Sequence, residues 1–118
     1  MPERRAKKKT SKPPVLHQQF VRRFPHLGEA WDLVSEEGAA GPLDAKTQRL
    51  LTLAIAIGAM REGAVHAGVR KARDAGATTA EMEQVVALGA STIGLPAAVA
   101  VWSWVKEEAT GKKRSRGR

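Results

Sequence analysis

The chain has 118 residues, of which 42% are hydrophobic and 4% aromatic, and it carries a formal net charge of +8 without a single cysteine. This length suits one small domain, and the missing thiols exclude disulfide bonds, thiolate metal sites and a redox dithiol. No apolar signal segment lies near the N-terminus, so we expect a cytoplasmic protein.

The positive charge is concentrated at the two ends. Residues 1–12 and residues 111–118 each carry a net charge of +5, which leaves −2 for the residues between them. Blocks of like charge do not bury, so we expect disordered basic tails around a domain of residues 13–110. The tails either promote solubility or bind nucleic acid or an acidic partner.

The middle of the chain has a helical pattern throughout. No segment alternates with a period of two, and Gly or Pro interrupts the chain at helix-length intervals, which predicts an all-α fold. The first two helices are expected at about residues 15–24 and 27–37. A third begins after Asp44, whose carboxylate can accept the first free amides, and extends to about residue 60.

The second half of the chain carries clear helix boundaries. A fourth helix is expected at residues 62–75, ending at Gly76. Residues 78–81 have the pattern of a capping box, which begins a fifth helix. Pro96 suits the first turn of a sixth helix, which ends near Gly111.

Residues 85–105 contain no charged side chain, and this is about the length of a bilayer span. Gly94 and Pro96 interrupt the run, so two buried helices are favoured over a transmembrane helix. Trp102 and Trp104 are two positions apart and project from opposite sides of a helix. Both cannot face one core, so we expect a homo-oligomer; the alternative is a tryptophan on the surface.

Three segments together resemble one known family. They are residues 41–47 before the third helix, the Gly-Ala-Thr turn of residues 76–78 with Glu81, and residues 94–98. With residues 61–75 they make residues 25–108 similar to the carboxymuconolactone decarboxylase and alkyl hydroperoxidase D (AhpD-like) family. The resemblance implies a fold of about six helices, a pocket between the third and fourth helices, and a trimer or hexamer.

The peroxidase branch of this family carries Cys-x-x-Cys-x-x-x-His on the helix before that turn. When Gly76 is matched, the cysteine positions hold Arg61 and Ala64, the histidine position holds Gly68, and the position of a relay glutamate holds Arg49. The family implies peroxiredoxin-type peroxidase or decarboxylase activity. Thiol peroxidase chemistry is not expected here, because it requires a cysteine sulfur. Whether the protein is an enzyme stays open.

Glu62 and His66 are the candidate catalytic residues. They lie one helical turn apart, so the carboxylate can orient the imidazole and the two can form a general acid–base couple. The alternative is a polar helix face that continues through Arg70 and Arg73 with ordinary contacts one turn apart.

Arg49 and Arg61 are the candidate ligand-binding residues. Two guanidinium groups beside the family pocket suit a carboxylate or phosphate held by paired hydrogen bonds. The alternative is that each arginine pairs with a nearby acid such as Glu62, Asp44 or Glu81.

We expect no metal and no cofactor, because His17 and His26 lack a second ligand at metal-binding spacing and no phosphate-binding glycine motif occurs. The leading hypothesis is a cysteine-free family member that binds or transforms a small anionic organic molecule. The alternative is a non-enzymatic oligomeric scaffold that presents its basic tails to nucleic acid or to acidic partners.

Overall fold

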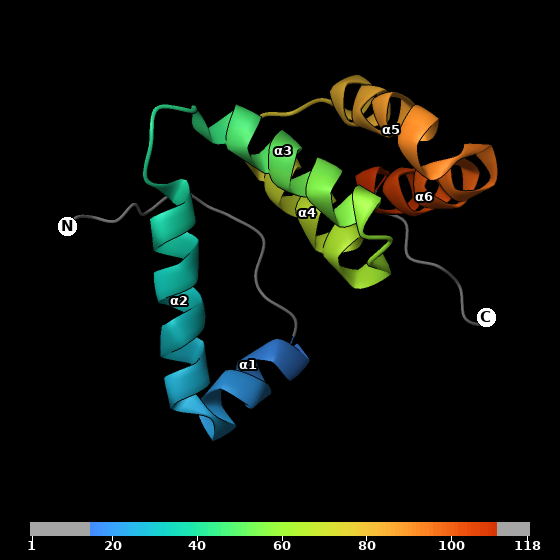
Figure 1. Cartoon of the computed structure of the whole chain (residues 1–118). Helices are drawn as coiled ribbons and strands as arrows, with labels where there is room; N and C mark the ends of the chain where they lie inside the picture. The colour runs from blue at the N-terminus through green and yellow to red at the C-terminus, as the bar shows by residue number, and fades with distance from the viewer. Residues whose placement is uncertain (1–14, 111–118) are drawn as a thin grey trace. The chain divides into compact units, whose positions relative to one another are not determined.

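Helices are the only regular elements among residues 15–110, the part of the chain that the computed structural model describes. The prediction of an all-α fold is therefore confirmed for these residues, whereas the predicted tails at 1–12 and 111–118 lie outside them. The six helices, labelled in Figure 1, are α1 (Val15–Arg23), α2 (Pro25–Ala39), α3 (Ala45–Gly58), α4 (Glu62–Asp74), α5 (Thr79–Ile93) and α6 (Leu95–Ala109).

Helices α1 and α2 form a unit of their own, separate from α3 to α6. Pro25 occupies the first turn of α2, so this helix begins two residues before the predicted position. The rings of Phe20 and Phe24 lie 5.0 Å apart at the junction of the two helices. Neither helix buries a residue, so this unit contributes no core of its own.

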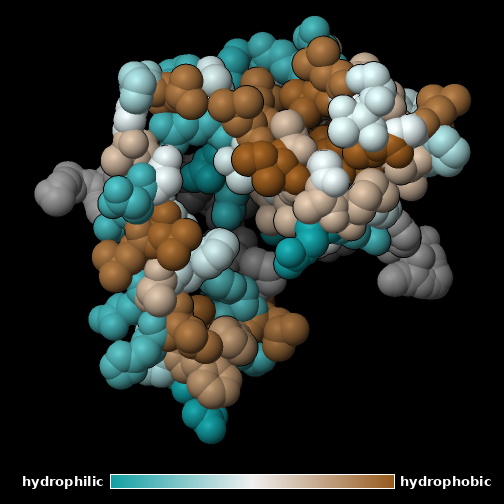
Figure 2. Space-filling view, viewed as in Figure 1, coloured by the Kyte–Doolittle hydropathy of each residue, from teal (hydrophilic) through white to brown (hydrophobic). Residues whose placement is uncertain are grey.

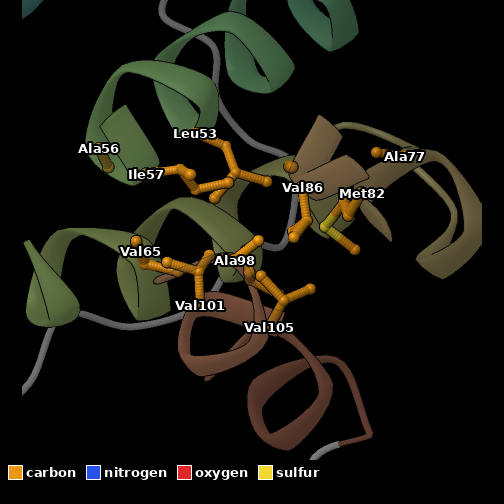
Figure 3. Close-up of a cluster of buried hydrophobic side chains, with 12 residues drawn as sticks. Leu53, Ala56, Ile57, Val65, Ala77, Met82, Val86, Ala98, Val101 and Val105 are labelled. Atoms are coloured by element: carbon orange, nitrogen blue, oxygen red, sulfur yellow. The ribbon is translucent and has the colours of Figure 1, made fainter. Parts of the chain in front are cut away.

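Helices α3 to α6 surround the hydrophobic core. Helix α3 packs on α4 and α5, and α6 packs on the same two helices. Each helix directs a stripe of side chains inward at spacings of three or four residues, which is the periodicity of one helical face. The largest side chains of this core, most of which are drawn in Figure 3, are Leu53, Ile57, Val65, Val69, Met82, Val101 and Val105.

The predicted capping box at the start of α5 is confirmed. The Thr78 hydroxyl accepts from the Glu81 amide at 3.0 Å, and the Thr78 amide donates to the Glu81 carboxylate at 2.9 Å. The bond from the Thr78 amide, together with Lys46, holds the pKa of Glu81 below its usual value. Asp44 precedes α3 as predicted but caps no amide, because its carboxylate accepts from the Thr47 hydroxyl instead.

The uncharged run of residues 85–105 is divided between α5 and α6, as predicted. Gly94, with φ of 92°, makes the break in a conformation that favours glycine. Within residues 15–110, no helix combines the length and the apolar character needed to cross a membrane.

The two tryptophans of α6 face different surroundings. Trp104 packs against the core. Trp102 is exposed, and its indole nitrogen donates to Glu83 at 2.9 Å while the Lys106 ammonium lies over its ring. Within one subunit Trp102 is therefore a surface residue, and the predicted homo-oligomer stays a prediction.

Candidate functional site

The interface between α3 and α4 is closely packed where the resemblance implies the family histidine. Gly68 is buried, and a β-carbon added there would lie 3.2 Å from Leu53 Cδ1 and 3.5 Å from the Leu53 α-carbon. A larger side chain at residue 68 therefore requires Leu53 to move. The pocket expected between α3 and α4 stays a prediction.

A cavity of about 350 Å³ opens between α3 and α5. Thr92 supplies the one side chain with a polar atom among its lining residues, so the cavity suits apolar groups. The lining residues are Leu50, Leu51, Ala54, Ile57, Gly58, Val85, Leu88, Gly89, Thr92 and Ile93.

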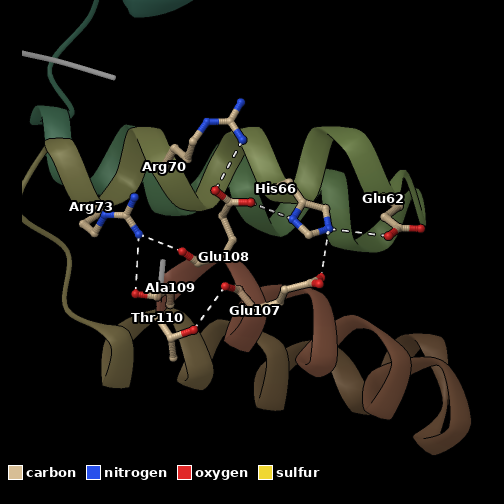
Figure 4. A network of polar contacts seen from close by, with 8 residues as sticks. All are labelled: Glu62, His66, Arg70, Arg73, Glu107, Glu108, Ala109 and Thr110. Atoms are coloured by element: carbon tan, nitrogen blue, oxygen red, sulfur yellow. Dashed lines mark hydrogen bonds and ion pairs between the residues drawn. The ribbon is translucent and has the colours of Figure 1, made fainter. Parts of the chain in front are cut away.

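His66 lies on α4 and faces carboxylates from two helices (Figure 4). Its Nε2 lies 3.5 Å from a Glu62 oxygen, so the predicted Glu62–His66 pair does meet. Two further partners come from α6. Glu108 Oε1 lies 2.9 Å from Nδ1, and Glu107 Oε1 lies 3.8 Å from Nε2. The imidazole is 20% exposed, so these contacts are partly shielded from water.

The same face of α4 binds the end of α6 through two arginines. Arg70 Nη1 lies 3.5 Å from a Glu108 carboxylate oxygen. Arg73 Nη1 donates to the Glu108 carbonyl at 2.9 Å, in the last turn of α6. The polar face expected from the sequence is therefore present, and it fastens the last turn of α6 to α4.

This geometry permits chemistry as well as attachment. When Nδ1 carries the proton it donates to Glu108, and Nε2 then accepts a proton beside Glu62 and Glu107. A catalytic role for Glu62 and His66 stays a prediction. Within residues 15–110, no group of three or more His, Asp or Glu side chains is arranged to hold a metal ion.

Glu107 and Glu108 were not identified from the sequence. One signal was available, because acidic residues in the last turn of a helix oppose the helix dipole and need compensation from elsewhere. Their partner His66 is about forty positions earlier in the chain, so the compensating contact depends on how α4 and α6 pack.

The two candidate ligand-binding arginines lie apart. Arg61 immediately precedes α4, whereas Arg49 lies in the second turn of α3, about 14 Å along the helix from its end at Gly58. They therefore do not converge on one small ligand. Neither arginine makes an ion pair with a residue that the structure describes. Of the acids expected as partners, Glu81 pairs with Lys46 at 3.0 Å and Glu62 with His66.

Arg49 has another cation beside it. Leu53 of α3 lies opposite Gly68 of α4, so one turn further along this antiparallel pair Arg49 lies near Lys71. Partial burial and the positive charges of Arg49 and Arg70 hold the pKa of Lys71 below its usual value. Lys71 was missed because the pairing depends on the register between the two helices.

Comparison with known proteins agrees with the fold. The model of the carboxymuconolactone decarboxylase family matches residues 25–107, which cover most of the described helices. The comparison with curated proteins gives no significant match, and the comparison with solved structures gives none either. The match spans both helical units and more than half of the chain, and it agrees with the resemblance in residues 41–47, 76–78 and 94–98. The chain belongs to the carboxymuconolactone decarboxylase family.

Proposed function

We propose that this cysteine-free family member binds a small anionic organic molecule, and that Arg49 and Lys71 hold its carboxylate or phosphate group. The observation that carries this proposal is the juxtaposition of two cations from facing helices, neither ion-paired with a described acid. Like charges held side by side repel each other. An anion between them relieves the repulsion and accepts charge-assisted hydrogen bonds from both.

The chemistry open to this protein excludes a thiol step. Arg61 and Ala64 occupy the positions of the peroxidase cysteines, and neither side chain can attack a peroxide as a thiolate does. For a ligand that is transformed, the proposed proton-transfer group is the Glu62–His66 couple, supported by the carboxylate contacts on both imidazole nitrogens.

Isothermal titration of the full chain with small monocarboxylates, dicarboxylates and inorganic phosphate tests the proposal. Arg49→Ala and Lys71→Ala are expected to weaken binding about tenfold or more, because each removes a charge-assisted hydrogen bond. Arg61→Ala is the matched control, since it removes another exposed arginine, directly before α4 and away from Lys71. Flat heats with every anion, or equal losses in all three variants, would refute the assignment.

A second readout follows from the perturbed lysine. Partial burial and, after it, the neighbouring cations lower the pKa of Lys71, so a bound anion is expected to raise this pKa. Titration of the lysine side chains by NMR, with and without an anion that binds in the calorimetric experiment, measures this change. If an anion binds and the pKa of Lys71 does not change, the anion binds at another place.

The charge of the two tails favours a second candidate function, a scaffold that presents them to nucleic acid. Each tail carries a net charge of +5, and several tails in one oligomer would act together. A salt series of binding to double-stranded DNA tests this candidate. Binding that falls steeply with salt and survives Arg49→Ala would support it, whereas no binding at low salt would exclude it.

A further inference from the structure

The unit formed by α3 to α6 has two different kinds of surface. Figure 2 shows hydrophobic surface gathered over α3 and α5, where no charged side chain lines the cavity. The contact between α4 and α6 instead brings three carboxylates to one imidazole. Oxygens of Glu62, Glu107 and Glu108 lie 2.9–3.8 Å from the ring nitrogens of His66. Groups that can exchange a proton with one another are therefore gathered between α4 and α6.

Only one of these three carboxylates lies at hydrogen-bond distance from the ring. Glu108 Oε1 is 2.9 Å from Nδ1, whereas oxygens of Glu62 and Glu107 are 3.5 Å and 3.8 Å from Nε2. Hydrogen bonds from nitrogen to oxygen span about 2.7–3.2 Å. Of the three contacts, the contact of Nδ1 with Glu108 alone has the length of a hydrogen bond.

This hydrogen bond determines which ring nitrogen carries the proton. An ionised carboxylate can only accept a hydrogen bond, so Nδ1 must donate to Glu108. A neutral imidazole has one N–H, and its other nitrogen is an acceptor. In the neutral ring of His66 the proton therefore lies on Nδ1, and Nε2 keeps its lone pair.

We infer that Glu108 is a positioning residue, which sets the tautomer of His66 and leaves Nε2 as the nitrogen that can accept a proton. The spacing along α4 predicts this role for Glu62. In the structure Glu62 lies beside the opposite ring nitrogen, so the orienting carboxylate comes from α6 instead. The catalytic meaning of this inference rests on the proposed Glu62–His66 couple, whereas the tautomer does not depend on any ligand.

Glu108 is held from two sides, as Figure 4 shows. Its second carboxylate oxygen lies 3.5 Å from Arg70 Nη1, so one oxygen contacts the imidazole and the other contacts the guanidinium. Its backbone carbonyl accepts from Arg73 Nη1 at 2.9 Å. The side chain is 24% exposed, which limits competition from water. A carboxylate fixed in this way can hold a histidine in one tautomer.

Nε2 has surroundings that suit proton transfer. Its two carboxylate neighbours come from different helices, and neither brings an N–H or O–H that would occupy the lone pair. Glu62 is the more exposed of the two, at 49% against 18% for Glu107. A proton that moves from a ligand to Nε2 can leave the imidazolium through Glu62 to water.

NMR of the imidazole nitrogens in the full chain tests the inference, because the chemical shift of each nitrogen reports whether it carries the proton. His17→Gln and His26→Gln together leave His66 as the only histidine, so its signals need no further assignment. At a pH where the ring is neutral, we expect the proton on Nδ1. In Glu108→Ala the Nδ1–H form is expected to become the minor form, because Glu62 can then accept from Nε2.

Glu62→Ala and Glu107→Ala are the matched controls, since each removes one carboxylate from the same ring on the side of Nε2. Both should leave the proton on Nδ1. The spectrum of the chain with Glu108 intact decides the tautomer by itself, and a ring protonated on Nε2 would overturn the inference. A proton that stays on Nδ1 in Glu108→Ala, with the helical circular dichroism unchanged, would overturn it too. Flat calorimetric heats would count against anion binding alone, because no ligand takes part in this measurement.

Discussion

Gly63 and Gly68 lie on the same helix, α4, and alanine at the two positions is expected to have different effects on stability. No atom lies within 4 Å of a β-carbon built at Gly63, so alanine there gains only backbone rigidity. This gain is about 0.5–1 kcal/mol. At Gly68 the same gain opposes a β-carbon that lies 3.2 Å from Leu53 Cδ1.

Crowding of this kind costs about 1–3 kcal/mol in a packed core. Gly68→Ala is therefore expected to be neutral to about 2 kcal/mol destabilising, and Gly63→Ala to be stabilising. At about 4 °C per kcal/mol for a chain of this size, the two melting temperatures should differ by about 4–12 °C. Urea unfolding at one fixed protein concentration measures the free energies directly.

A double-mutant cycle identifies Leu53 as the cause. Leu53→Ala alone is expected to cost about 2–5 kcal/mol because it leaves a cavity. In that background the crowding Leu53 Cδ1 is gone and only contacts of ordinary van der Waals length remain, so Gly68→Ala should become stabilising, with a coupling of about 1–3 kcal/mol. If Gly68→Ala stabilised the natural chain as much as Gly63→Ala does, the tight contact between α3 and α4 would be refuted. A histidine at residue 68 would then have room there.

Two further predictions concern the polar contacts. His66→Ala should cost about 1–3 kcal/mol and speed amide exchange in the last turn of α6, because Glu108 loses its imidazole partner; an unchanged urea midpoint would contradict this. Glu81→Gln should make the free energy of unfolding depend less on pH in the acid range. The pKa of Glu81 is lowered in the folded protein, so its contribution is present above the unfolded value of 4.5 and is lost as the pH falls through the folded value. If the free energies of unfolding of the natural chain and of Glu81→Gln differed by the same amount at pH 7 and at pH 2, this linkage would be ruled out.

Local signals were sufficient for most of the helix boundaries. The capping box at residues 78–81, the turns at Gly76 and Gly94 and the proline in the first turn of α6 all lie where the sequence predicted them. Each depends on contacts within a few residues, so no knowledge of packing is needed. Asp44 is the exception, because Thr47, three positions away, provides a competing hydrogen bond.

The candidate site depended on packing to a much greater extent. The Glu62–His66 contact was predicted because it spans one turn of a single helix. Glu107 and Glu108 come from α6, and no sequence pattern sets which face of α6 meets α4. Arg49 and Lys71 lie on different helices, and their proximity follows from the packing of Leu53 against Gly68.

The sequence by itself determined that this chain is all-α, that it lacks the means for thiol chemistry, and which family it resembles, since these follow from residue types and from contacts a few positions apart. Only the tertiary structure decided that a cavity opens between α3 and α5 and that Lys71 of α4 lies within the electrostatic influence of Arg49 of α3. The physical reason is that side chains far apart in the chain become neighbours through helix packing, and the volumes of core residues such as Leu53 set the register of that packing.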